Sequence, residues 1–163
     1  MDKYMFIKML YFADRESLAR WGEPITGDHA VSMKYGPVLS IIYDLTKGDC
    51  PLYHGDWSQF ISDADSETNR ISLANDSTET DALCPAELEI LKSVFEKFQN
   101  WTWKQMRDFS HDLAEYDKTV GNGARGIAIE GILRATGKND EQIQDIAECN
   151  HQIRMAEMMF SGS

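Results

Sequence analysis

The sequence predicts an α+β fold, with five to six helices around a buried N-terminal helix and a small antiparallel β-sheet. Apolar residues recur at helical spacing along most of the chain, and one short segment alternates between two turn-rich stretches. The 163 residues are 42% hydrophobic, which suffices for one compact domain without disulfides or metal. We therefore expect a single domain over residues 1–163, with its core at about 1–120 and a helical C-terminal part at 121–163.

The first expected helix runs from Asp2 to Arg20. Its apolar residues occupy nearly every direction around the helix axis, and Gly22 follows just past its end. A helix that is apolar on all sides is normally enclosed by its neighbours. The sequence therefore predicts that this helix is the centre of the fold.

A short strand is expected at residues 30–35, where apolar and polar residues alternate. Gly36-Pro37 is expected to end it and to open a helix that ends near Gly48, because proline is tolerated in a first helical turn. A hairpin is predicted over residues 57–73, with an acidic tip at residues 63–69. Together with the strand at 30–35, this hairpin would form the small sheet.

The second half is expected to be helical. A helix is predicted at residues 85–99, and Thr102 with Gln105 forms a capping box that starts the next one. The Gly121-Asn122-Gly123 segment is the best candidate for a hinge. Beyond it, a short helix at 127–135 precedes a last helix from Asn139, which either docks on the core or contacts a partner.

The charge balance bears on the choice of partner. There are 16 Lys and Arg against 27 Asp and Glu, a net charge of −11, and the basic residues do not cluster. Nucleic acid is therefore an unlikely partner and an anionic membrane a poor one, whereas a basic protein is a good one. Alternatively, the negative charge only keeps the protein soluble.

Cysteine spacing and hydropathy bear on the compartment. Cys50, Cys84 and Cys149 are widely spaced, with no CxxC pair, which argues against a disulfide framework and suits a reducing cytoplasm. No apolar run approaches the ~20 residues of a membrane span. We therefore expect a cytoplasmic protein that does not insert into a membrane.

The sequence indicates no catalytic chemistry. It contains no glycine-rich phosphate loop, no HExxH and no GxSxG, and Cys50 with His54 lacks the second pair of a zinc site. His111, between Asp108 and Asp112, fits either an acid–base site or a histidine near a helix C-terminus, which the helix dipole favours. We expect the second, and hence a non-enzyme with no catalytic residue, metal site or cofactor.

Four motifs in the first 45 residues carry a resemblance to a known family. They are Lys8-Met9-Leu10-Tyr11-Phe12-Ala13-Asp14, Pro24-Ile25-Thr26-Gly27-Asp28, Lys34-Tyr35-Gly36-Pro37-Val38 and Tyr43-Asp44-Leu45. This order resembles the Panacea domain of SocA-like antitoxins, also described as phage-associated GepA-like proteins, over about residues 3–120. The resemblance implies an antitoxin that neutralises a toxin encoded beside it by direct binding. The alternative that it implies is an adaptor that delivers a toxin or another client to a protease.

The resemblance also suggests which residues matter and with whom they act. The expected partner is a cognate toxin, basic in charge, and the expected assembly is either a homo-oligomer or a toxin–antitoxin heterocomplex. Structural roles are expected for Tyr11, Phe12, Gly27, Gly36 and Pro37. Candidates for partner binding are Asp14, Arg15, Asp28, Lys34 and Tyr35. The four charged residues among these candidates form either an internal ion-pair network or a binding surface, and Tyr35 also suits packing of the strand on the buried helix.

Overall fold

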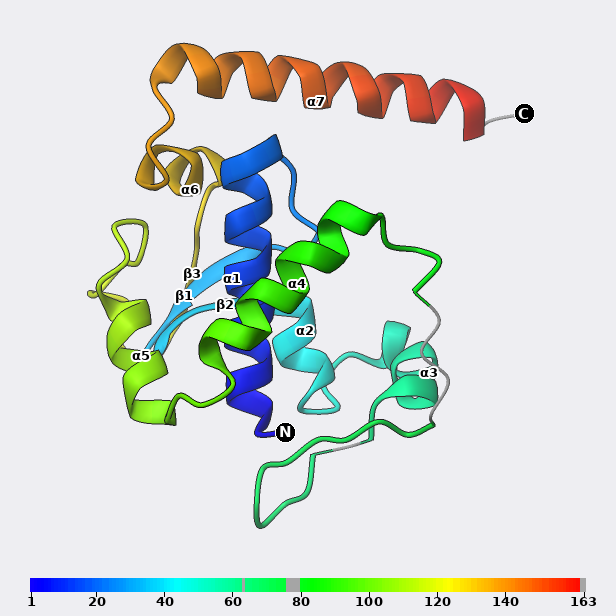
Figure 1. Ribbon diagram of the computed structural model, residues 1–163, viewed down its shortest axis with the longest axis vertical. Coiled ribbons are helices and arrows are strands. Elements are labelled where there is room, and N and C mark those ends of the chain that lie inside the picture. Colours follow the sequence, from blue (N-terminus) through cyan, green and yellow to red (C-terminus); the bar gives the residue numbers. More distant parts are fainter. Residues whose placement is uncertain (63, 76–79, 162–163) are drawn as a thin grey trace.

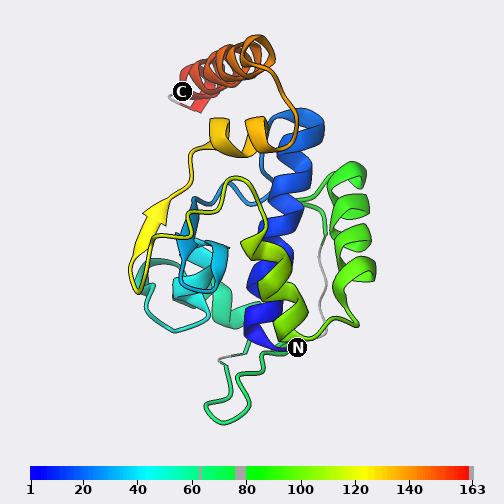
Figure 2. The same cartoon turned by 90° about the vertical axis from the view of Figure 1, so that its left-hand side faces the viewer.

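The computed structural model describes residues 1–62, 64–75 and 80–161, and it confirms the α+β fold (Figure 1). Helix α1 (Lys3–Trp21) runs through the middle of the molecule. Turned by 90°, the molecule shows α1 between α4 (Pro85–Phe98) and the β-sheet (Figure 2). Helix α5 (Trp103–His111) also packs against α1. The prediction of a central N-terminal helix is confirmed.

Helix α1 has strong signals at both ends. The Asp2 carboxylate accepts hydrogen bonds from the backbone N–H groups of Tyr4 and Met5, at 2.9 and 3.0 Å, which caps the first turn. Gly22 ends the helix at φ +81°, a conformation that glycine adopts without a steric penalty. Between the ends, Phe12 stacks on Phe98 of α4 with ring centroids 4.9 Å apart, so the core lies between these two helices.

The sheet is antiparallel, with β1 (Ala30–Met33) between β2 (Gly36–Leu39) and β3 (Ala124–Gly126). Gly36-Pro37 therefore begins a strand, and the prediction that it opens a helix is wrong. Lys34 and Tyr35 form a two-residue turn, and Gly36 at φ +98° lets the chain reverse there. Proline lacks a backbone N–H, and β2 tolerates it because β2 is an edge strand. The next helix, α2 (Ser40–Leu45), starts three residues later.

The predicted hairpin at residues 57–73 is wrong in its first arm, most of which belongs to helix α3 (Pro51–Phe60), but Ile61 at the end of that arm does form an antiparallel bridge with Leu73. The Trp57 ring packs edge-on against Phe6 of α1 at 6.1 Å. The short apolar run around Trp57 fits helical as well as alternating spacing, so periodicity does not distinguish the two. The return segment also reaches the chain start, where Ile71 N–H donates to the Met1 carbonyl at 2.9 Å. Of the expected acidic tip, residue 63 lies outside the described residues.

The second half contains the predicted capping boxes. Thr102 and Gln105 cap α5 reciprocally, and Asn139 with Gln142 does the same for α7 (Asp140–Ser161), through hydrogen bonds of 2.8 to 3.3 Å. Gly121-Asn122-Gly123 leads directly into β3, which pairs with β1. Helix α6 (Ile129–Ala135) then packs on α1. The chain after these glycines is thus tied to the core twice before α7 begins.

Within residues 1–62, 64–75 and 80–161, no helix is long and apolar enough to cross a membrane. The two helices with sufficient length, α1 and α7, carry charged residues along their whole sequence.

Gly36 offers a test of how tightly the sheet packs on α1. A Cβ there would overlap Ser110 Oγ and lie 2.6 Å from Lys8 Nζ, and both of these side chains are fully buried. Because this overlap adds to the strain of a side chain at φ +98°, Gly36→Ala should lower the free energy of unfolding by about 3 kcal/mol, measured by urea titration. Gly27→Ala is the control, since Gly27 has φ +67° but nothing within 4 Å, and should lose only ~1 kcal/mol. Equal losses would show that the Cβ is accommodated at Gly36.

Candidate functional site

The family-like motifs line two hollows, and α1 and the sheet contribute to the walls of both. The first, here the aromatic hollow, has a volume of about 570 Å³ and is lined by residues of three motifs together with aromatic side chains of α1 and α5. These residues include Tyr4, Lys8, Lys34, Tyr35, Gly36, Val38, Tyr43 and Trp103. The second, here the Asp14 hollow, has a volume of about 660 Å³ and is lined by Tyr11, Asp14, Arg15 and Asp28 with residues of the sheet and α6.

Three aromatic rings form one side of the aromatic hollow. Trp103 lies between the other two rings, with its centroid 5.5 Å from that of Tyr4 and 6.2 Å from that of Tyr35. Tyr35 stays 52% exposed and Tyr4 38% exposed. Tryptophan and tyrosine are enriched among the residues that dominate protein–protein binding energy. The arrangement therefore suits contact with another macromolecule.

Lys8 contributes to the hollow from α1 and ties it to the sheet. Its ammonium donates a 2.8 Å hydrogen bond to the Pro37 carbonyl, and the residue is only 2% exposed. Among the described residues it pairs with no carboxylate, and burial lowers its pKa to about 7. This contact joins the first motif to the third.

Two of the motif aspartates, Asp14 and Asp28, bond to backbone. The Asp14 carboxylate accepts from the N–H groups of Ile25 and Thr26, both at 2.9 Å, and from the Thr26 hydroxyl. Burial raises the pKa of Asp14, and these hydrogen bonds oppose that effect. Asp28 accepts from Ile41 and Ile42 N–H at 3.1 and 2.9 Å and so caps α2. Asp14, at 3% exposure, thus has an internal role rather than a surface one.

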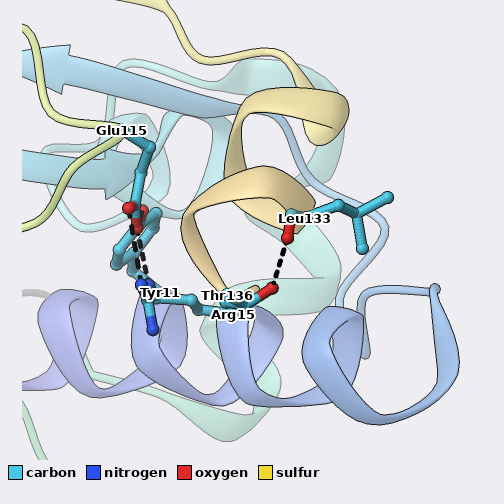
Figure 3. A network of polar contacts seen from close by, with 5 residues as sticks. All are labelled: Tyr11, Arg15, Glu115, Leu133 and Thr136. Carbon is cyan, nitrogen blue, oxygen red and sulfur yellow. Dashed lines mark hydrogen bonds and ion pairs between the residues drawn. The ribbon is translucent and has the colours of Figure 1, made fainter. Parts of the chain in front are cut away.

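Arg15 takes part in a partly buried polar cluster (Figure 3). The Arg15 guanidinium and the Tyr11 hydroxyl both donate to Oε1 of Glu115, at 2.6 and 2.8 Å. The Glu115 side chain is fully buried, and burial together with this carboxylate raises the pKa of Tyr11. Glu115 was not predicted, because it lies 100 residues away from Arg15 in a segment without periodicity.

Lys34 and Tyr35 are the two candidates that the structure leaves exposed. They occupy the β1–β2 turn, where the Lys34 ammonium lies 5.5 Å from the centroid of the Tyr35 ring. Sequence reasoning missed Tyr4, Tyr43 and Trp103 as their neighbours. Tyr4 and Lys8 are four residues apart on a helix, and this spacing was the available signal for Tyr4.

Comparison with protein families decides where these motifs belong. The family described as antitoxin SocA-like, Panacea domain, matches residues 6–116, which is more than half of the chain. The chain belongs to this family. A comparison with curated proteins and one with solved structures found no match.

The Panacea segment contains most of both hollows, and it ends before β3, α6 and α7. Of the residues with expected structural roles, Tyr11, Phe12, Gly36 and Pro37 are buried. Gly27 is exposed, at φ +67° in the loop that Asp14 holds.

His111 of this Panacea domain packs rather than pairing with an acid. Its ring stacks on Tyr116 at 4.8 Å, and its buried Nε2 has no hydrogen-bond partner among the described residues. Burial lowers the pKa of His111, and the charges of Lys8 and Arg107 add to this. Asp108 instead accepts from Arg107 at 2.6 and 2.9 Å. Within the described part of the chain, no three His, Cys, Asp or Glu residues are placed to hold a metal ion.

The Arg15–Glu115 pair can be tested against a second arginine on the same helix. Arg15→Ala would leave the buried Glu115 carboxylate with the Tyr11 hydroxyl alone, so the free energy of unfolding should fall by about 3 kcal/mol. Arg20 forms an exposed ion pair with Glu16 one turn away, and Arg20→Ala should cost less than ~0.5 kcal/mol. Chemical denaturation of both variants measures the difference, and losses of similar size would contradict a special role for the buried pair.

Lys8 should make stability depend on pH. Its pKa is about 7 in the folded state against 10.5 as the ordinary value, so between these values the unfolded chain binds one more proton. The penalty of burying the charge is complete below pH 7 and is relieved as pH rises, by up to ~1.4 kcal/mol per pH unit. Relative to Lys8→Met, the wild type should therefore gain stability between pH 7 and 9.5 in urea titrations. Lys34→Met controls for loss of an exposed lysine, and parallel curves for wild type and Lys8→Met would refute the assignment.

Proposed function

We propose that this protein is a non-enzymatic antitoxin that neutralises a cognate toxin by direct contact through the aromatic hollow. The family match supports an antitoxin role in general. The observation that carries the proposed contact is the exposed Tyr35, which the third motif presents beside Tyr4 and Trp103. A stoichiometric inhibitor of this kind needs an interface of about 1,000 Å² or more, centred on such anchors.

The turn that carries Tyr35 is held before any partner arrives. The Tyr116 hydroxyl donates to the Met33 carbonyl at 3.0 Å and lies 3.3 Å from the Lys34 carbonyl. Lys8 anchors the other side of the turn through Pro37. An anchor on a pre-organised backbone loses little conformational entropy on binding, so more of its contact energy contributes to affinity.

The net charge of −11 favours a basic toxin. Opposite charges accelerate encounter and make the association rate sensitive to salt, while the apolar contacts govern dissociation. Lys34, which lines the hollow, carries a positive charge and would therefore meet an acidic or polar group of the partner.

The toxin contact is tested with the product of the neighbouring reading frame whose expression arrests growth. Tyr35→Ser should weaken its binding to the purified antitoxin at least tenfold, measured by titration calorimetry. Tyr53→Ser is the matched control, because Tyr53 is 47% exposed on α3, outside the hollow, and this change should leave affinity unchanged. Equal effects of the two variants would remove the hollow from the contact, and absence of binding by the wild type would refute neutralisation by contact.

Co-expression separates neutralisation from delivery to a protease. Neutralisation by binding leaves the amount of toxin unchanged while growth recovers, whereas an adaptor lowers the amount of toxin. His111→Ala should keep its rescue of growth if no catalysis is involved. Recovery accompanied by loss of toxin would support the adaptor function instead.

A further inference from the structure

Helix α7 docks on the core through its first half only. Ile143 is buried, and Asn150 donates a 3.0 Å hydrogen bond to the Gly22 carbonyl at the end of α1. Ile146 packs so closely on Gly22 that a Cβ there would lie 2.6 Å from it. Beyond Asn150, every side chain of α7 that the structure describes is exposed. The ribbon shows this half extending past α1 (Figure 1).

The free half of α7 is apolar on two opposite sides. At 100° per residue, Ile153 lies within about 20° of the docked Ile146, whereas Met155, Met158 and Met159 lie on the other side of the helix. Ile153 and Met155 are 42% and 44% exposed, and Met158 and Met159 are each 71% exposed. An ordinary surface helix places its apolar residues on one stripe that faces the core. A segment apolar on both sides is instead suited to enclosure by another molecule.

The charge of α7 selects among the possible occupants. Four acidic residues, Asp140, Glu141, Asp145 and Glu148, lie in the docked half, whereas the free half carries Glu157 against Arg154. A second copy of this protein, with its net charge of −11, or an anionic membrane would therefore meet like charge next to the free half, which opposes association. A partner with an apolar groove for the methionines and with Lys and Arg where the groove meets the docked half satisfies both features. Methionine is flexible and polarisable, and it adapts well to such a groove.

We propose that residues 151–161 of α7 insert, as a helix of ~16 Å, into an apolar groove of the toxin whose rim is basic. This inference rests on the proposed antitoxin function and adds a second contact, separate from the aromatic hollow. The inserted segment lies outside the Panacea match at residues 6–116. The antitoxin thus contributes a helix, and the toxin contributes the groove.

The test replaces two methionines by a polar residue of similar length and good helix propensity. Met158→Gln/Met159→Gln should weaken binding of the neighbouring frame's toxin about tenfold or more, measured by titration calorimetry on the full chain. Leu52→Gln is the matched control, because Leu52 is an 80% exposed apolar residue on α3. The affinity of this variant for the toxin should equal that of the wild type. Thermal unfolding of each variant should match the wild type, since the replaced side chains are exposed.

Two further measurements identify the occupant. Hydrogen exchange should show residues 151–161 becoming protected when the toxin is added, and sedimentation of the antitoxin alone should show no dimer that depends on Met158 and Met159. A dimer abolished by the double substitution would mean that the occupant is a second copy and would overturn the proposal. Unchanged toxin affinity in the double variant would overturn it as well, while leaving the antitoxin function intact. Failure of the wild type to bind the toxin would overturn both.

Discussion

The hydrogen bond from the Lys8 ammonium to the Pro37 carbonyl is the contact on which the arrangement of this protein depends. It joins the central helix to the edge strand β2 inside the protein, and Gly36 leaves the space that it needs. A buried amine with a carbonyl as its described partner is poorly solvated, and for this reason its pKa falls to about 7. The chain thus accepts an energetic penalty to hold the β1–β2 turn in one position. The same turn presents Tyr35 to solvent.

Other polar residues in and around the motifs also form their hydrogen bonds within the protein. Asp14 holds the loop after α1 through backbone N–H groups, and Asp28, at the end of that loop, caps α2. Glu115 receives Tyr11 and Arg15 from α1. Because buried polar groups are costly without partners, these residues constrain one another's position. Tyr4 and Tyr35 of the aromatic hollow remain exposed, whereas Trp103 is partly buried.

Local signals made part of this fold predictable from sequence. The start and end of α1 follow from Asp2 and Gly22, and the starts of α5 and α7 follow from their capping boxes, because these contacts span only a few residues. The first arm of the predicted hairpin was wrong because a short apolar run fits both helix and strand. The pairing of β3 with β1 spans about 90 residues of sequence and has no local signal. Glu115 could not be predicted either, because it contacts residues about 100 positions away in the sequence. Of the candidate site, the motif residues were predicted, whereas Trp103 was supplied by tertiary packing.

Exposed apolar side chains gather at two places in the protein, near the N-terminal end of α1 and on the second half of α7. At the N-terminal end of α1, the domain closes around a rigid turn and leaves three aromatic rings accessible. At the C-terminal end, β3 and α6 complete the sheet and cover α1, and only then does α7 run beyond the core. The added C-terminal elements therefore first stabilise the domain and then extend it. A partner that met both ends would be held by a pre-formed surface at one and by an adaptable helix at the other, and these differ in the entropy that each loses on binding.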